Sequence, residues 1–354
     1  MLYHLAASLP MMVCLIWAVI LWIDFSASDP ARRQLAVFAL VATVLYACHF
    51  VHFEGSGAFG FADCLWCLCT LSVYPLYRLY VVTLTTRDYP PLLSVLPWFL
   101  PALALSGWTL AVWVKGGDPA TVRRVTGWVD FLVSITAAAS CFLRLARFRR
   151  SVRNYYADTE GKLLNPVLVL LVLLVVIALA SAVSSLLGRA RFEGTSLLLI
   201  PSLLFSTLLF GIFYSGWRTV RPEPEVREDA VEPVMDDARM QQLMQRIERE
   251  MIIGERFRVP GLKISDIAEA VGSNRSYVSG AINRLSGLSF SDYVNRFRVR
   301  YAQELIRNQG KALPLSEVSE RSGYADRTSF YRAFKKETGV SPSEWMASFY
   351  GMQP

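Results

Sequence analysis

The first 217 residues of the chain consist mainly of long apolar runs that are separated by short polar breaks. Each run holds about 20 residues, the length that a helix needs to cross roughly 30 Å of hydrocarbon. Because lipid offers the backbone no hydrogen bonds, such runs are expected to be helices. We count seven of them, at about 4–23, 34–53, 60–83, 92–114, 125–143, 164–187 and 196–217.

Charged residues are concentrated in the rest of the chain. The whole sequence is 53% hydrophobic and only 18% charged, yet 21 of its 36 Lys and Arg residues fall from Arg218 onward. Residues 218–239 hold three prolines and show no apolar periodicity, which is typical of a solvated linker. We therefore expect a transmembrane bundle over 1–217, an acidic, Pro-rich linker over 218–239 and a soluble domain over 240–354.

Basic residues beside the apolar runs predict the orientation of the bundle, because Lys and Arg are enriched in cytoplasmic loops. If the soluble domain is cytoplasmic, seven spans leave the N-terminus outside. Twelve flanking basic residues then lie inside and five lie outside, which favours this arrangement. All six cysteines precede residue 218, and a soluble domain without cysteine is consistent with a reducing compartment.

Two similar segments of the soluble domain each predict a pair of short helices joined by a tight turn. The first segment covers 262–287, where Ser276 is placed to cap the second helix. The second segment covers 313–339, and its apolar positions follow those of the first at an offset of 52 residues. An amphipathic helix over 289–306 connects them. Such a connection can hold two recognition helices about one turn of DNA, roughly 34 Å, apart.

The stretch "GYADRTSFYRAFKKETGVSPSEWM" resembles the C-terminal signature of the AraC/XylS family of bacterial transcription regulators. Residues 260–349, roughly a quarter of the chain, are similar to that family's DNA-binding domain. The resemblance implies a seven-helix, double helix-turn-helix fold that binds promoter DNA, with RNA polymerase as a partner and activation as the expected role. The residues themselves leave the sign of regulation open. The resemblance says nothing directly about the apolar block, whose predicted spans we expect to lie in a bacterial inner membrane.

The net charge from residue 240 onward is only +5, from 17 basic and 12 acidic residues. This charge is modest for a protein that binds phosphate-rich DNA. Dimerisation or clustering in the membrane would raise the binding strength, so we expect a homodimer.

Candidate DNA contacts fall on the second helix of each segment. Arg332 can bind guanine through two hydrogen bonds, the commonest specific contact. Gly280 stands where the second segment has Arg332, so either its neighbours read bases over a close backbone approach or the first segment adds little specificity. The candidate base-reading residues are Ser276, Ser279, Asn283, Thr328, Tyr331 and Arg332. The candidate phosphate contacts are Arg275, Arg284, Arg298, Lys335 and Lys336.

Some of these phosphate candidates have a second interpretation. A solvated helix end is the alternative for Lys335 and Lys336. Arg298 lies in the connecting helix with Arg296 and Arg300, and at least one of these three arginines is expected to pack against nearby acids instead.

The few ionisable residues of the apolar block gather at one side of the predicted bundle, where all three histidines fall at the outer ends of spans. A shared pocket near the outer leaflet is one hypothesis, and polar helix ends that meet water are the alternative. The candidate pocket residues are His4, His49, His52, Glu54, Asp63 and Asp130.

Four residues of the same region have side chains that can bind zinc or copper(I), namely His49, His52, Cys64 and Cys67. The two cysteines could instead form a redox-sensitive disulfide. Buried cysteine is common as a small apolar residue, so an ordinary hairpin that lines a ligand pocket is favoured over a metal site.

Three roles for the predicted bundle remain: a sensor, an anchor and dimerisation platform, or a transporter or membrane enzyme with an attached regulatory domain. Few intramembrane charges and no sign of an inverted repeat weigh against transport. The soluble domain shows no zinc spacing, phosphate-binding glycine loop or nucleophile motif, so neither a cofactor nor enzymatic activity is expected. We therefore expect an all-α, membrane-embedded transcription regulator that responds to an unknown small-molecule or membrane signal.

Overall fold

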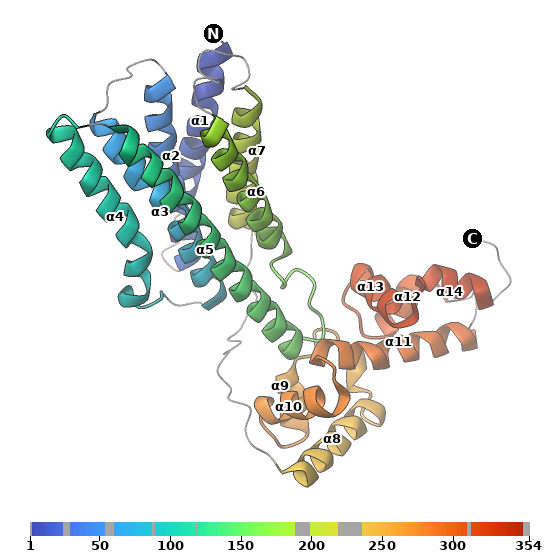
Figure 1. Cartoon of the computed structure of the whole chain (residues 1–354). Helices are drawn as coiled ribbons and strands as arrows, with labels where there is room; N and C mark the ends of the chain where they lie inside the picture. The colour runs from blue at the N-terminus through green and yellow to red at the C-terminus, as the bar shows by residue number, and fades with distance from the viewer. Residues whose placement is uncertain are drawn as a thin grey trace. The chain divides into compact units, whose positions relative to one another are not determined.

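The structure is a computed structural model, and it describes residues 2–23, 29–53, 60–86, 89–117, 119–187, 199–218, 236–309 and 313–349. Every regular element in these ranges is a helix, and the extended pairing found there is limited to a bridge between Tyr156 and Lys263. The chain divides into two compact units (Figure 1). Unit 1 is formed by Met1–Ala146 and Leu164–Arg221, and unit 2 by Arg147–Leu163 and Pro222–Pro354.

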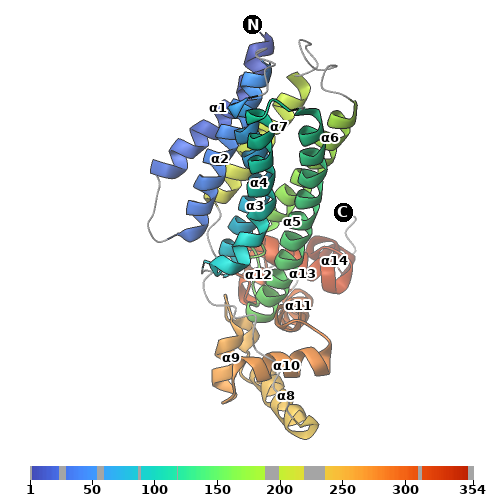
Figure 2. The same cartoon turned by 60° about the vertical axis from the view of Figure 1, so that its left-hand side comes forward.

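Unit 1 is a bundle of long helices. Its elements are α1 (Leu2–Ile23), α2 (Pro30–Phe53), α3 (Phe61–Thr86), α4 (Leu92–Val114), most of α5 (Pro119–Tyr155), α6 (Asn165–Leu187) and α7 (Leu199–Arg218). Helix α1 packs against α2 and α7, α2 packs against α3, and α3 packs against α4 (Figures 1 and 2). Helices α6 and α7 also pack against each other.

Five described helices are long and apolar enough to cross a membrane. They are His4–Ile23, Pro30–Val51, Phe61–Thr86, Leu92–Val114 and Thr121–Tyr155. The last two predicted spans are helical as well, but their described apolar parts, Asn165–Val176 and Ser202–Trp217, are shorter. The predicted all-α fold is therefore confirmed for the residues that the structure describes, and five of the seven predicted spans are long and apolar enough there to cross a membrane.

The outer surface of unit 1 is apolar. Leu93 in α4 is 84% exposed and Trp128 in α5 is 62% exposed, and many other large apolar side chains are exposed along the same helices. Polar side chains such as Asp63 and Thr126 are buried instead. Soluble proteins seldom expose contiguous apolar surface on this scale, so unit 1 presents a surface suited to an apolar environment.

Unit 2 contains the two predicted helix pairs. Its elements are the end of α5, α8 (Asp237–Ile252), the 3₁₀ helix η3 (Arg256–Arg258), α9 (Ile264–Ala270), α10 (Arg275–Ser286), α11 (Phe290–Gln309), α12 (Leu315–Arg321), α13 (Arg327–Thr338) and α14 (Pro342–Phe349). Helices α9 and α10 form the first pair, α12 and α13 form the second, and α11 contacts both pairs.

The second helices of the two pairs begin with equivalent caps. The side chain of Asn274 accepts a hydrogen bond from the backbone of Tyr277, and that of Asp326 accepts one from Ser329. Our prediction that Ser276 caps the first of these helices was wrong. Helix α10 already begins at Arg275, because an Asn at the preceding position can satisfy a free N–H of the first turn.

The buried sides of the two helices also correspond. Val278 and Ile282 in α10 are fully buried, as are Phe330 and Phe334 in α13 at the predicted offset. Gly323, in the turn before α13, has a φ of 86°, and a Cβ there would lie 2.6 Å from the carbonyl oxygen of Arg258. Only glycine fits that turn without a shift of the backbone.

Unit 2 also includes Arg147–Leu163, which the sequence analysis assigned to the membrane part, 1–217. Residues 156–163, here called the 156–163 segment, are held to other parts of unit 2 by hydrogen bonds of the Ala157 backbone. The N–H of Ala157 donates to the carbonyl of Leu262 at 3.0 Å, and the Ser291 hydroxyl donates to the carbonyl of Ala157 at 2.7 Å. Most of the predicted linker lies outside the described residues.

Candidate nucleic-acid interface

Helix α13 carries the second set of predicted base-reading residues. Phe330 and Phe334 form its buried side, so Thr328 and Arg332 point away from the core and are exposed. The side chain of Arg332 is 68% exposed. An arginine that projects from an amphipathic helix of a helix-turn-helix pair can reach the edge of a guanine in the major groove.

Tyr331 is held at one side of this surface. Its hydroxyl accepts a hydrogen bond from Nη2 of Arg327 at 2.9 Å and lies 3.1 Å from Oγ of Ser343. Burial raises the pKa of Tyr331, but these hydrogen bonds and the charge of Arg327 outweigh it, so its pKa is lower than usual. Arg327 therefore orients the phenol rather than leaving it free to turn.

The guanidinium of Arg332 contacts an acid that is absent from the predicted site residues. Its Nη1 lies 3.2 Å from Oε1 of Glu160, a residue of the 156–163 segment. The hydroxyl of Ser329, one helical turn before Arg332, lies 2.7 Å from Oε2 of Glu160. The available signal was a pair of acids, Asp158 and Glu160, in an otherwise basic stretch between two predicted spans.

Asp326, which caps α13, is the second carboxylate near Ser329. Its Oδ2 lies 2.7 Å from the Ser329 hydroxyl, and its Oδ1 accepts the backbone N–H of Ser329 at 2.8 Å. Burial raises the pKa of Asp326, but the hydrogen bonds from Ser329 and the backbone of Thr328 outweigh it and keep this pKa below its usual value. The cap is therefore charged at neutral pH.

Helix α10 presents smaller side chains. Ser276, Ser279 and Asn283 are half-buried, and the amide of Asn283 donates to the hydroxyl of Ser279 at 3.2 Å. A Cβ at Gly280 would meet no atom within 4 Å, so the surface above this glycine is open. That space is compatible with a close approach of DNA to the backbone, and equally with a helix that contributes little specificity.

Most predicted phosphate contacts lie on the surface of unit 2. Arg275, Arg284 and Lys335 are exposed. Arg275 is also positioned over the ring of Tyr155, 5.8 Å from its centroid. Lys336 is exposed and its Nζ lies 2.5 Å from Oδ1 of Asp292.

Arg298 was predicted as a phosphate contact, and the structure places it elsewhere. Its side chain is fully buried, and its Nε and Nη2 donate to the carbonyls of Phe257 and Val259 at 2.7 and 2.9 Å. Its Nη1 lies 2.5 Å from Oδ1 of Asp158. With its donors bound inside the protein, Arg298 cannot reach DNA, and the packing alternative applies to it.

The residues of the predicted outer pocket are brought together only in part. Asp63 is buried, and its Oδ1 lies 3.8 Å from Nε of Arg123. His49 accepts a hydrogen bond from Nε1 of Trp66 at 3.3 Å. His4 lies exposed on α1 and Asp130 lies half-buried on α5, while Glu54 and the side chain of His52 fall outside the described residues.

The predicted metal ligands include two free, buried thiols. Neither Cys64 nor Cys67 forms a disulfide, and Sγ of Cys67 lies 3.6 Å from Oγ1 of Thr126. Within the described part of the chain, no group of three or more His, Cys, Asp or Glu residues is arranged to hold a metal ion.

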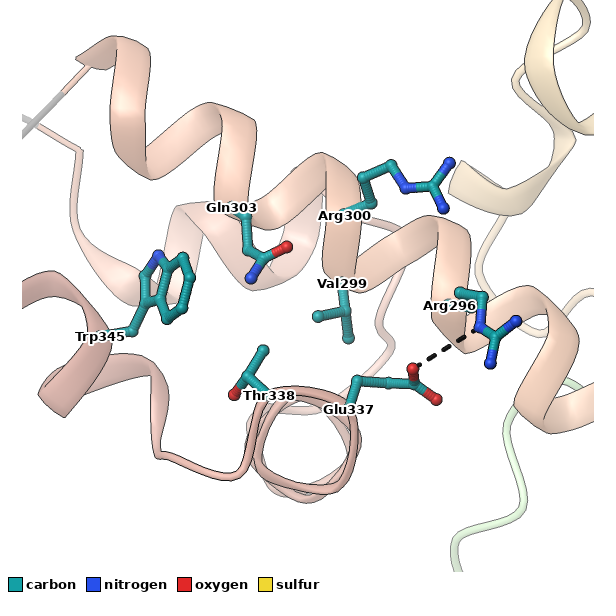
Figure 3. Close-up of a pocket in the computed structure, with 7 residues that line it drawn as sticks. All are labelled: Arg296, Val299, Arg300, Gln303, Glu337, Thr338 and Trp345. Carbon is teal, nitrogen blue, oxygen red and sulfur yellow. Dashed lines mark ion pairs between the residues drawn. The ribbon is translucent and has the colours of Figure 1, made fainter.

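A surface cavity of about 340 Å³ lies between α11, α13 and α14 of unit 2 (Figure 3). Its lining residues are Arg296, Val299, Arg300, Gln303, Glu337, Thr338 and Trp345. Nε of Arg296 lies 3.7 Å from Oε2 of Glu337, as the dashed line shows. Ligand cavities are mostly apolar, whereas charged and polar side chains dominate this lining, so we assign it no ligand.

Comparison with known proteins identifies the C-terminal part of the chain. Residues 267–348 match the family described as a helix-turn-helix domain. The chain is 32% identical to the Msm operon regulatory protein of Streptococcus mutans over 84 residues. This match covers 24% of this chain and 30% of that protein. The chain is 30% identical to the transcriptional activator RhrA of Rhizobium meliloti over 106 residues. This match covers 30% of this chain and 32% of that protein.

The melibiose operon regulatory protein of Escherichia coli is 27% identical over 84 residues, which are 24% of this chain and 27% of that protein. The chain thus spans only 27 to 32% of the length of these three relatives. No solved structure gives a significant match. The predicted helix-turn-helix domain is confirmed, and the matches to these regulators cover 24 to 30% of the chain.

Proposed function

We propose that this protein is a membrane-embedded transcription regulator that binds promoter DNA through α10 and α13. The observation that carries this proposal is the equivalence of these two helices within one matched helix-turn-helix domain, each with a capped start, a buried apolar side and an opposite polar side. Double-stranded DNA is the partner whose successive major grooves suit two recognition helices on a rigid connection.

Helices α10 and α13 contribute unequally to the proposed recognition of DNA. Arg332 reads a guanine, and Thr328 and Tyr331 contact bases beside it. Lys335 and Arg284 neutralise phosphates, which fixes the position of the domain on the duplex without reading sequence. The base-reading candidates of α10, Ser276, Ser279 and Asn283, are all short and surround Gly280, so its half-site is the less specific one.

The apolar surface of unit 1 supports a location in the lipid bilayer. Burying apolar surface is favourable by about 25 cal/mol per Å², so side chains such as Leu93 and Trp128 favour lipid over water. Aromatic side chains near helix ends also suit the interface between lipid and water. We propose the inner membrane of a bacterium, with unit 2 in the cytoplasm.

We further propose that unit 1 is a sensor for a small molecule or a membrane signal. Polar contacts such as that of the buried Asp63 with Arg123 join different helices, so a ligand that disturbs them would change how the helices pack. A homodimer would double the number of recognition helices, and RNA polymerase is the expected further partner. An anchor without sensing is the second candidate, and exchange of unit 1 for an unrelated membrane helix distinguishes the two.

Selection of DNA by the intact chain tests this function. The full-length protein would be placed in lipid nanodiscs and mixed with duplexes of random sequence, and the bound duplexes would be sequenced. We expect enrichment of a motif whose conserved bases lie about 10 base pairs apart, the spacing of one helical turn. Recovery of unenriched sequences would contradict specific DNA binding.

A further inference from the structure

We infer that the 156–163 segment restrains DNA binding from within the chain, because Glu160 occupies Arg332 in place of a DNA acceptor. This inference rests on the proposed DNA binding by α13 and adds a mechanism for its control. Glu160 contacts two residues of the recognition helix, Arg332 at 3.2 Å and Ser329 at 2.7 Å.

The segment is held in place by an anchor that is independent of Glu160. Oδ1 of Asp158 lies 2.5 Å from Nη1 of Arg298, and Oδ2 accepts the N–H of Gly261 at 2.8 Å. Ala157 adds the two backbone hydrogen bonds to Leu262 and Ser291. Asp158 and Ala157 are buried, so this anchor is a stable part of unit 2.

Glu160 competes with DNA for the same donor groups. An ionised carboxylate only accepts hydrogen bonds, as do the O6 and N7 atoms of guanine and the oxygens of a phosphate. When Nη1 of Arg332 is bound to Glu160, that nitrogen is directed toward protein rather than toward a base. The negative charge of Glu160 also repels the phosphates of an approaching duplex. Both effects weaken binding at the one helix that carries an arginine for base reading.

The contact between Glu160 and Arg332 can be broken at low cost in free energy. The ion pair is partly exposed, with 68% of the Arg332 side chain and 32% of the Glu160 side chain accessible, and pairs that water reaches contribute little to stability. The Ser329 hydroxyl has a single proton and two nearby acceptors, Glu160 and Asp326. When Glu160 leaves, Ser329 keeps Asp326 as its partner, so no donor is left unsatisfied.

The position of the segment in the chain connects this contact to the proposed sensor. It follows α5 directly and ends two residues before α6, and both helices contribute to unit 1. A signal that shifts either helix is therefore transmitted along the backbone to Thr159 and Glu160. With Asp158 held by Arg298, the movement is concentrated in the residues that carry Glu160.

The test compares two variants that remove one negative charge each. Glu160→Gln removes the proposed restraint. Glu250→Gln is the matched control, because Oε2 of Glu250 lies 3.4 Å from Nε of Arg256 in an ion pair that is also partly exposed, with accessible fractions of 31% and 45%. Full-length proteins in nanodiscs would be titrated against one duplex, enriched from random sequences by the Glu160→Gln protein, and the dissociation constants measured by fluorescence anisotropy.

We expect Glu160→Gln to bind this duplex about three- to tenfold more tightly than the unaltered chain, the scale of an exposed ion pair plus a nearby repulsive charge. Glu250→Gln should change binding by less than about twofold. In an Arg332→Ala background, Glu160→Gln should give a smaller gain than in the unaltered chain, because only the repulsive charge is then left to remove. Equal effects of the two Gln variants would overturn the restraint while leaving the proposed function intact, whereas no specific binding by any variant would overturn both.

Discussion

Arg298 and Asp158 are separated by 140 residues in the sequence, yet Nη1 of Arg298 lies 2.5 Å from Oδ1 of Asp158 in the core of unit 2. The guanidinium is fully buried and its other donors bind backbone carbonyls of Phe257 and Val259. The pair therefore ties residues between two apolar helices of the chain to the connecting helix of the DNA-binding domain.

Replacing Asp158 with Ala should destabilise unit 2 strongly. The substitution leaves the buried charge of Arg298 without its counter-ion, and loss of one partner of a buried pair costs about 3–5 kcal/mol. Hydrogen exchange of the full-length chain in nanodiscs measures the effect as faster exchange of the α11 amides. Glu250→Gln, which breaks an exposed pair, should leave that exchange unchanged. Unchanged protection in Asp158→Ala would show that the pair does not hold the segment.

Replacing Gly323 with Ala should also destabilise the second helix pair. The residue has a φ of 86°, and the added Cβ would lie 2.6 Å from the carbonyl oxygen of Arg258. Both the left-handed backbone and the clash oppose the substitution, with a cost of at least about 1 kcal/mol. This loss is measured as a lower midpoint of thermal unfolding, with hydrogen exchange of the α13 amides as the probe. An unaltered midpoint would contradict the close approach between these two segments.

Replacing Gly280 with Ala distinguishes the two interpretations of α10. The position is helical and open, so Ala should stabilise the helix by up to about 1 kcal/mol. If DNA approaches the backbone at Gly280, the more stable variant binds the selected duplex more weakly, by about tenfold for one methyl clash. If α10 contributes little specificity, affinity is unchanged. The two outcomes are distinguished by measuring, for the unaltered chain and for Gly280→Ala, both the dissociation constant for the selected duplex by anisotropy and the stability.

Asp326 gives unit 2 a defined response to acid. Its pKa in the folded protein is below the value in the unfolded chain, because hydrogen bonds to the carboxylate outweigh burial. Its contribution to stability is therefore present above the unfolded pKa, about 3.9, and is lost as pH falls through the lower folded pKa. Asp326→Asn keeps a capping oxygen but does not titrate. Unfolding midpoints between pH 6 and 3 should fall less steeply in that variant, and parallel curves would contradict this role.

The helix pairs could be predicted from the sequence because their signals are local. The apolar positions that bury Val278 and Phe330 recur within one helix and at a constant offset, and the glycines that end α10 and α13 stand at fixed places. The cap of α10 was misplaced by two residues because Asn274 and Ser276 are both favourable capping residues. Element ends are less strongly encoded than element type.

The contacts of the 156–163 segment could not be predicted in this way. Nothing near Arg298 in the sequence distinguishes a buried arginine from one on a DNA-facing surface, because its partner Asp158 lies on the far side of two apolar helices and the linker. Glu160 looked like an ordinary loop acid for the same reason. Pairing between residues so distant in sequence depends on how the helices pack, which neither periodicity nor composition reports.

The proposed reading of a guanine by Arg332 can be measured directly. The full-length chain and its Arg332→Ala variant, both in nanodiscs, would be titrated against the selected duplex and against duplexes in which each guanine of the motif is replaced in turn. We predict that one replacement weakens the unaltered chain by about 1–3 kcal/mol and leaves Arg332→Ala unaffected. If the variant discriminates among these duplexes as well as the unaltered chain does, Arg332 reads no base and the proposed interface is wrong.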